Sequence, residues 1–232
     1  SAITQLQVAS KLTRNNEQRG RLYFIEGQLY SALGVKDSAN LAFDKVIALN
    51  RRTPRAYMIS AHLEKIKNFD LENGDKFELQ ELLEDLETNR ENRPFLDKIY
   101  HQIAKYQLQK DSDSTAISYF NKSLRTNSED DYLKAINYQT LGDLNFDYSE
   151  YSLAGSYYDS TLLNLKENSK PFRVIKRKRD NLEDVIYYES IAQDNDSILS
   201  IVAMSGSDKE AYFQRYIETL KLEEEASKKA EA

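Results

Sequence analysis

The chain has 232 residues, of which 40% are hydrophobic and 30% charged, and it contains only seven glycines and three prolines. Turn-forming residues are too sparse for most β architectures, so an all-α fold is expected. The formal net charge of −6 argues against a general nucleic-acid-binding protein. Because cysteine is absent, disulfide frameworks, thiolate nucleophiles and cysteine-ligated metals are excluded. No apolar run approaches the roughly 20 residues that span a bilayer.

Residues 2–13 are expected to form the second helix of an incomplete helix pair. Their small and apolar residues repeat the spacing that appears later at Ala39, Phe43 and Val46. An array of repeats normally ends in a polar capping element rather than in half a unit. This beginning therefore predicts a piece of a longer protein.

Three later segments share one pattern of small and aromatic residues. A small residue is followed twelve positions later by alanine, with one aromatic residue four before the first and another four after the second. Two antiparallel helices approach closely only where side chains are small, and aromatic rings fill the space between successive pairs. Helix pairs are therefore expected at about 20–50, 97–127 and 135–165. The small residues are Gly27 and Ala39, Ala104 and Ala116, and Gly142 and Ala154. The aromatic residues are Tyr23 and Phe43, Tyr100 and Phe120, and Tyr138 and Tyr158.

A further pair is expected over residues 54–90 in a degenerate form. Ala61 lies 34 residues after Gly27 and has Tyr57 four residues before it. The second helix of this pair, KFELQELLEDLE at 76–87, is displaced by an insertion around NFDLENGD.

The segment YQTLGDLNF, with the alanine and tyrosine that follow it, resembles the tetratricopeptide repeat, a 34-residue helix-turn-helix unit. The chain departs from that pattern by lacking tryptophan and repeat-end prolines, and by having Glu26 for leucine and Asn145 for tyrosine. The resemblance implies a right-handed superhelical solenoid of antiparallel helix pairs over residues 1–167.

Residues 168–232 are predicted to form a C-terminal helical extension. Pro171 starts a long helical stretch, the segment NDSILSIVAMS follows, and a last helix comes after it. The last helix is expected to begin at Ser207, which forms a capping box with Glu210. Its wholly charged end either frays into solvent or continues as a coiled coil.

The segments YFIEGQLY, KVIALN and RAYMISAHLEK, together with the distal DNDSILSIVAMSGSDKEAYFQRYIETLK, are similar to the SprE/PorW family of tetratricopeptide lipoproteins. That family serves gliding motility and type IX secretion in Bacteroidetes. The resemblance implies a periplasmic location, with a tether to the outer membrane through a lipid anchor outside this fragment. It also implies protein partners in the envelope secretion or motility machinery.

No catalytic or metal-binding motif is present in the sequence. It has no His-Glu-x-x-His, no phosphate-binding glycine loop and no nucleophile elbow. The two histidines, His62 and His101, have no neighbours at metal-ligand spacing, and a solvated groove position is expected for both. We therefore expect a protein without catalytic residues, cofactor or metal, whose function is protein binding.

The tetratricopeptide resemblance also implies which residues line a concave surface, because the first helix of each pair faces it. Long basic side chains with apolar residues between them would suit a segment that carries carboxylates and one or two apolar anchors. The alternative is that these are ordinary exposed residues of first helices. The residues are Arg21, Phe24, Gln28, Arg55, Met58, His62, Lys65, Lys98, His101, Lys105, Ile136, Gln139, Asp143 and Phe146.

A second candidate docking patch consists of five positive charges within seven residues. Nucleic acid is not expected as its partner, because no aromatic residues suitable for base stacking are interleaved. The patch either docks on an acidic partner or on acidic segments of the chain itself such as ELLEDLE, or it is a solvated helix face. The residues are Arg173, Lys176, Arg177, Lys178 and Arg179.

The sixteen tyrosines, in a chain without tryptophan, leave peptidoglycan contact as a minor alternative. Tyrosines at helix-packing spacing are more often part of the core.

The leading expectation is a non-catalytic protein–protein interaction scaffold, a periplasmic component that supports type IX secretion and gliding motility. The alternative is a cytosolic adaptor that binds acidic peptide segments in a basic concave groove. A secretion signal and a lipid-anchor cysteine upstream in the full gene would discriminate between the two.

Overall fold

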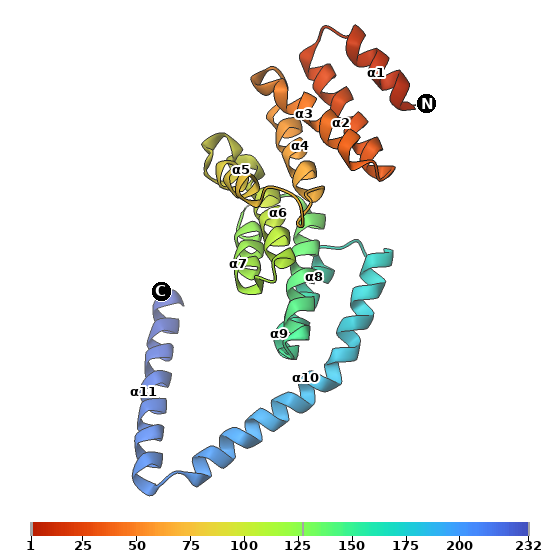
Figure 1. Cartoon of the computed structure of the whole chain (residues 1–232). Coiled ribbons are helices and arrows are strands. Elements are labelled where there is room, and N and C mark those ends of the chain that lie inside the picture. The colour runs from red at the N-terminus through yellow and green to blue at the C-terminus, as the bar shows by residue number, and fades with distance from the viewer. Residues whose placement is uncertain (1, 127, 232) are drawn as a thin grey trace.

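The structure is a computed structural model that describes residues 2–126 and 128–231. Within these residues it contains eleven α-helices and no strand, which confirms the expected all-α class. Figure 1 shows α1 to α9 stacked in a row, with α10 and α11 extending from the far end of that row as a bent arm.

Six of the nine described helices of the row form three closely packed pairs. The bounds of these nine helices are α1 (Ala2–Leu12), α2 (Asn16–Ala32), α3 (Lys36–Ala48), α4 (Arg55–Lys67), α5 (Lys76–Thr88), α6 (Leu96–Gln109), α7 (Asp113–Leu124), α8 (Asp131–Asp147) and α9 (Tyr151–Leu163). Short 3-10 turns at Asn50–Arg52 and Arg90–Phe95 precede α4 and α6. α1 packs against α2, and α2 with α3, α6 with α7 and α8 with α9 form three closely packed hairpins.

The same turn closes each of these three hairpins. A residue with positive φ follows the first helix: Gly34 (75°), Asp111 (54°) and Ser149 (63°). The amide of the next residue then bonds back to a carbonyl in the last helical turn, for example Val35 N to Tyr30 O at 3.0 Å. This is the Schellman arrangement, which satisfies helix-end carbonyls and reverses the chain. Because the turn recurs seven residues after each small anchor residue, it belongs to the repeat.

Close helix approach explains the glycines inside first helices. A Cβ atom added to Gly27 would lie 2.4 Å from Cε1 of Phe43, and one added to Gly142 would lie 2.7 Å from Cε1 of Tyr158. Glycine costs about 1 kcal/mol relative to alanine within a helix. Packing of an aromatic ring against the bare backbone offsets that cost. The remaining anchor residues, Ala39, Ala61, Ala104, Ala116 and Ala154, are also fully buried.

The pair α4–α5 departs from this arrangement. The aromatic column of the repeat falls on Phe77, whose side chain is 72% exposed. α5 instead buries Leu79, Leu83 and Leu86 in one cluster with side chains of α4 and α6. At the position of the reversing residue, Asn68 keeps right-handed helical backbone angles, and residues 68–75 continue as the inserted loop. α5 therefore does not lie closely along α4, unlike the second helices of the other pairs.

The arm consists of α10 (Lys170–Ala203) and α11 (Gly206–Glu231). The hydroxyl of Ser169 accepts a hydrogen bond from the Phe172 amide and so caps α10. The helix then runs without a break through the segment NDSILSIVA. The predicted capping box at Ser207 is wrong. The hydroxyl of Ser205 accepts the Asp208 amide at 3.3 Å and donates to the Asp208 carboxylate at 2.6 Å, so the cap lies two residues earlier.

Only the first half of α10 is fastened to the row of helices. Ile175 and Leu182 are buried in a cluster with Ala154 and Tyr158 of α9, and Ile186 covers Gly155. Beyond Ile186, no described side chain of α10 or α11 is buried.

We expect Gly142→Leu to lower the free energy of unfolding by about 3 kcal/mol or more, since overpacking a tight core contact costs at least 1–3 kcal/mol. Urea denaturation followed by circular dichroism would measure the change. Gly206→Ala is the matched control, because a Cβ atom there meets no atom within 4 Å. Equal stability of the two variants would contradict the assigned contact between α8 and α9.

Candidate protein-interaction surfaces

The cations predicted for the concave face are largely balanced by carboxylates. The pairs are Arg55 with Glu91 at 2.6 Å, Lys65 with Asp44 at 2.5 Å, and Lys98 with Asp130 at 3.8 Å. Arg21 and Lys105 are exposed and have no ion pair within the described part of the chain. Of the five cations expected to make this face strongly basic, only Arg21 and Lys105 remain unpaired in the described chain, and they lie on different helices.

The other residues predicted for this face lie in mixed surroundings. Phe24 is partly buried and packs against the core, with its ring 5.7 Å from that of Phe43 and 6.0 Å from that of Tyr57. Gln28 and Phe146 are exposed. The partly covered members are Met58, Ile136, Gln139 and Asp143.

His62 lies in a crevice between α3 and α4 rather than free in a groove. Burial of the imidazole, together with the nearby Lys65 and Arg55, lowers its pKa to about 4, and Asp44 partly opposes this shift. The ring is therefore neutral near pH 7.

His101 has a structural role at the junction of α6, α7 and α8. Its Nδ1 lies 2.6 Å from Oδ1 of Asn137, whose amide donates to the Ser123 hydroxyl at 2.8 Å. Ser123 donates in turn to the backbone carbonyl of Asp97 at 2.6 Å. Burial lowers the pKa of His101, although the hydrogen bond to Asn137 opposes this effect. Among the described side chains, no three histidine or acidic groups gather closely enough to hold a metal ion.

The displaced α5 opens a crevice of about 870 Å³ between α3, α4 and the inserted loop. His62 and Lys65 line it, but most of its charged residues are acidic. They are Asp37, Asp44, Asp70, Glu72, Asp75 and Glu78, against Lys36 and Lys65. This part of the surface therefore has the opposite charge to the one expected from first-helix positions alone.

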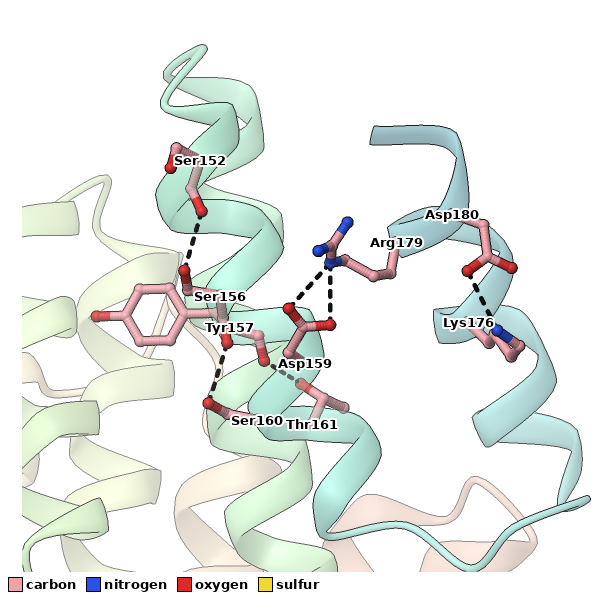
Figure 2. A network of polar contacts seen from close by, with 9 residues as sticks. All are labelled: Ser152, Ser156, Tyr157, Asp159, Ser160, Thr161, Lys176, Arg179 and Asp180. Atoms are coloured by element: carbon pink, nitrogen blue, oxygen red, sulfur yellow. Dashed lines mark hydrogen bonds and ion pairs between the residues drawn. The ribbon is translucent and has the colours of Figure 1, made fainter. Parts of the chain in front are cut away.

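The basic run on α10 docks within the chain. Arg179 Nε lies 2.9 Å from Oδ1 of Asp159 on α9, as Figure 2 shows, while Lys176 pairs with Asp180 one turn along its own helix at 3.2 Å. Lys178 reaches Asp143 of α8 at 2.7 Å. The acidic partners are thus not those of ELLEDLE, which lies on α5. Arg173 and Arg177 remain exposed, without an ion pair among the described residues.

Asp143 joins three helices at one atom. Its Oδ1 accepts hydrogen bonds from the Tyr158 hydroxyl on α9 and from Lys178 Nζ on α10, both at 2.7 Å. Burial and the Asp143 carboxylate together raise the pKa of Tyr158 well above its usual range. The tyrosine therefore stays protonated and keeps donating to Asp143.

Beside this junction lies a pocket of about 680 Å³ between α8, α9 and α10. Phe146 and Tyr151, whose rings are 5.5 Å apart, form one wall, and Leu182 and Val185 of α10 form another. Asp147 adds a carboxylate that has no ion pair in the described chain. The pocket combines two residues predicted for the concave face, Asp143 and Phe146, with Lys178 of the basic run. Sequence spacing did not indicate Asp147, Tyr151, Leu182 or Val185, because only the docking of α10 places them together.

The arm beyond the pocket carries many large exposed apolar side chains, whose ring contacts in the described chain are between sequence neighbours, Tyr187 with Tyr188 and Tyr212 with Phe213. On α10 they are Tyr187, Tyr188, Ile191, Ile198, Leu199 and Val202, and on α11 they are Tyr212, Phe213, Tyr216, Ile217, Leu220 and Leu222. Residues 204–205 separate the two helices, and Figure 1 shows that α10 and α11 diverge from there, so they do not cover one another. Single exposed apolar residues are ordinary, but a contiguous set marks an interaction surface.

Among the described residues, no helix combines the length and the apolarity needed to cross a membrane. No model of a known protein family matches the chain, and no curated protein matches it.

We expect His62→Gln to reduce the loss of stability on acidification. The folded-state pKa of about 4 lies below the ordinary 6.5, so the unfolded chain takes up the proton first as the pH falls. Wild-type stability is therefore lost between pH 6.5 and about 4, and this contribution disappears in the variant. Urea denaturation of both proteins at several pH values would measure it. Parallel curves over that interval would show that His62 is not held neutral by the fold.

We expect Asp143→Ala to loosen the first half of α10 by about 1–2 kcal/mol, because a half-buried hydroxyl and a lysine lose their shared acceptor. Hydrogen exchange of the amides at 172–186 would report the loosening. Asp180→Ala removes a carboxylate of the same helix-interior type that serves only the pair with Lys176, and its effect should stay below about 0.5 kcal/mol. Similar protection in the two variants would contradict the three-helix junction.

Proposed function

We propose that this chain is a non-catalytic protein–protein interaction scaffold. The observation that carries the proposal is the number of large exposed apolar side chains along α10 and α11, which are fastened to the helical row at one end only. Burial of apolar surface contributes roughly 25 cal/mol per Å², so a long apolar arm is stabilised by a protein partner that covers it. The row of helices positions the arm and leaves it accessible.

The row itself is proposed to be a right-handed tetratricopeptide-like solenoid. Support comes from the repeated close contact of a small residue with an aromatic ring and from the recurring Schellman turn. The pair α4–α5 is the degenerate member of this solenoid, with its second helix displaced by the inserted loop.

The setting of the scaffold rests on the resemblance to the lipoproteins of type IX secretion and gliding. In that setting the chain is a periplasmic component tethered to the outer membrane, and it binds proteins of the secretion or motility machinery. A secretion signal followed by a lipid-anchor cysteine in the full gene, together with lipid labelling of the full-length protein, would test the location.

The adaptor alternative, in which a basic groove binds acidic peptides, has less support. Three of the cations that would form the groove, Arg55, Lys65 and Lys98, are already paired with carboxylates of the chain. An acidic peptide would have to displace those carboxylates to bind.

Partner capture with two variants would test the scaffold proposal. An arm variant changes Tyr188, Ile191, Leu199 and Val202 to serine, and a face variant changes Arg55, Lys65, Lys98 and Lys105 to glutamate. We expect the arm variant to lose the partners that the wild-type chain captures from envelope extracts, and the face variant to keep them. Circular dichroism would establish that both variants stay helical. The reverse pattern would support the adaptor, and capture of the same partners by both variants would contradict both functions.

A further inference from the structure

The charges of α10 are separated along the helix. Residues 170–179 contain six basic and no acidic residues, and residues 180–203 contain six acidic and no basic residues. The basic residues are Lys170, Arg173, Lys176, Arg177, Lys178 and Arg179, and the acidic residues are Asp180, Glu183, Asp184, Glu189, Asp194 and Asp196. A helix macrodipole favours acidic residues at the N-terminus and basic ones at the C-terminus, which is the opposite order. The stability of the isolated helix therefore does not account for this distribution.

The basic half combines a single sign of charge with an apolar stripe. The surface of α8 and α9 beneath it matches both. Ile175 of this half enters the apolar cluster on α9, which Leu182 joins two turns later, while Lys178 and Arg179 meet carboxylates of α8 and α9. Charge and apolar contact together dock this half.

The acidic half starts with Leu182 and Ile186 still packed on α9, but beyond Ile186 its carboxylates and apolar side chains have no matching surface within the described chain. Apart from Asp180, which pairs with Lys176, its five carboxylates form no ion pair there. Beside them, an exposed seam follows the alternating three- and four-residue spacing of a helix-packing face. The seam consists of Val185, Tyr188, Ala192, Asn195, Leu199 and Val202.

The seam is long enough for a helical partner and begins at an existing pocket. Its 18 residues span about 27 Å at roughly 1.5 Å per residue. Val185, the first of them, also lines the pocket that Phe146 and Tyr151 form at the end of the row. Asp147 adds a further unpaired carboxylate to that pocket. Apolar contact and negative charge therefore continue from the pocket along the arm.

From these observations we infer that the acidic half of α10 docks a basic amphipathic helix of another protein. This inference rests on the proposed scaffold function and specifies the chemistry of its partner. The partner helix presents one apolar face to the seam and carries lysine or arginine on both flanks, opposite the carboxylates of α10. One of its apolar side chains enters the pocket beside Phe146.

A second copy of the chain fits this surface less well. Two acidic halves of α10 lying side by side would bring ten unpaired carboxylates together, five from each copy. The described apolar part of α11, residues 206–222, has three basic and three acidic residues, so it has no net positive charge to match the acidic half of α10. An acidic surface also repels anionic lipid and nucleic acid.

A pair of synthetic peptides would test the inference. One is an amphipathic helix of about 18 residues with leucine at three- and four-residue spacing and lysine on both flanks, and its twin has glutamate in place of each lysine. Fluorescence anisotropy with the whole 232-residue chain would measure both affinities. We expect the lysine peptide to bind at least about tenfold more tightly at low salt. High salt should reduce this difference, since exposed charges are screened.

Charge variants would locate the site. Changing Glu183, Asp184, Glu189, Asp194 and Asp196 to lysine should reverse the preference between the peptides. Changing Glu210, Glu218 and Glu223 of α11 to lysine is the control and should leave the preference as it is. Leu199→Ser should weaken binding of the lysine peptide at least about fivefold, because its apolar contact is lost.

Three results would overturn the inference: equal affinity for the two peptides, an unchanged preference in the five-residue variant, or no binding of either peptide. Dimers in analytical ultracentrifugation that disappear with Leu199→Ser would assign the seam to a second copy instead. The scaffold function has a separate outcome. If partner capture is lost in the arm variant but kept in the five-residue charge variant, the scaffold stands and only the basic character of its partner is wrong.

Discussion

The packing of the Tyr158 ring against Gly142 is the contact on which the far end of the molecule depends. The bare backbone at Gly142 lets α8 and α9 approach so closely that a Cβ atom would lie 2.7 Å from the ring. This approach holds the Tyr158 hydroxyl against Asp143, and the same carboxylate oxygen then receives Lys178 from α10. Asp143 therefore links the close packing of α8 on α9 to the ion pair with α10. The direction in which the arm leaves the row follows from both.

The distribution of charge accounts for which surfaces remain accessible to partners. Three of the five cations predicted for the concave face are paired with carboxylates of neighbouring elements, and two of the five cations in the α10 basic run are paired with α8 and α9. Ion pairs at such exposed positions each contribute only about 0–1 kcal/mol, so they orient the helices more than they stabilise them. The surfaces left with unpaired charge are mainly acidic: the crevice beside α5 and the second half of α10. A chain with a net charge of −6 thus concentrates its negative charge where apolar side chains are also exposed.

Local chemistry was sufficient to indicate the repeated features. Gly27 and Gly142 were assigned to close helix contacts from their spacing to an alanine and an aromatic residue, and the structure places Phe43 and Tyr158 against them. For the degenerate pair, the insertion around NFDLENGD indicated a displaced second helix, but not that Phe77, at the aromatic position of the repeat, would be exposed while Leu79, Leu83 and Leu86 are buried. The capping position of α11 was also two residues off, since Ser205 and Ser207 offer the same chemistry and only the backbone path selects between them.

The sequence by itself determined the helical class, the small residues at which helices approach, and the presence of basic and apolar segments in the C-terminal part. These properties depend on side-chain size and spacing within one or two helices. Only the tertiary structure decided which charges are free and which side chains share a pocket. Lys178 meets Asp143, and Phe146 faces Val185, across 35 or more residues of chain. Such contacts depend on the angle at which α10 returns over α9, and that angle results from the packing of Ile175 and Leu182 on α9 and from the ion pairs with α8 and α9 rather than from a pattern within one helix.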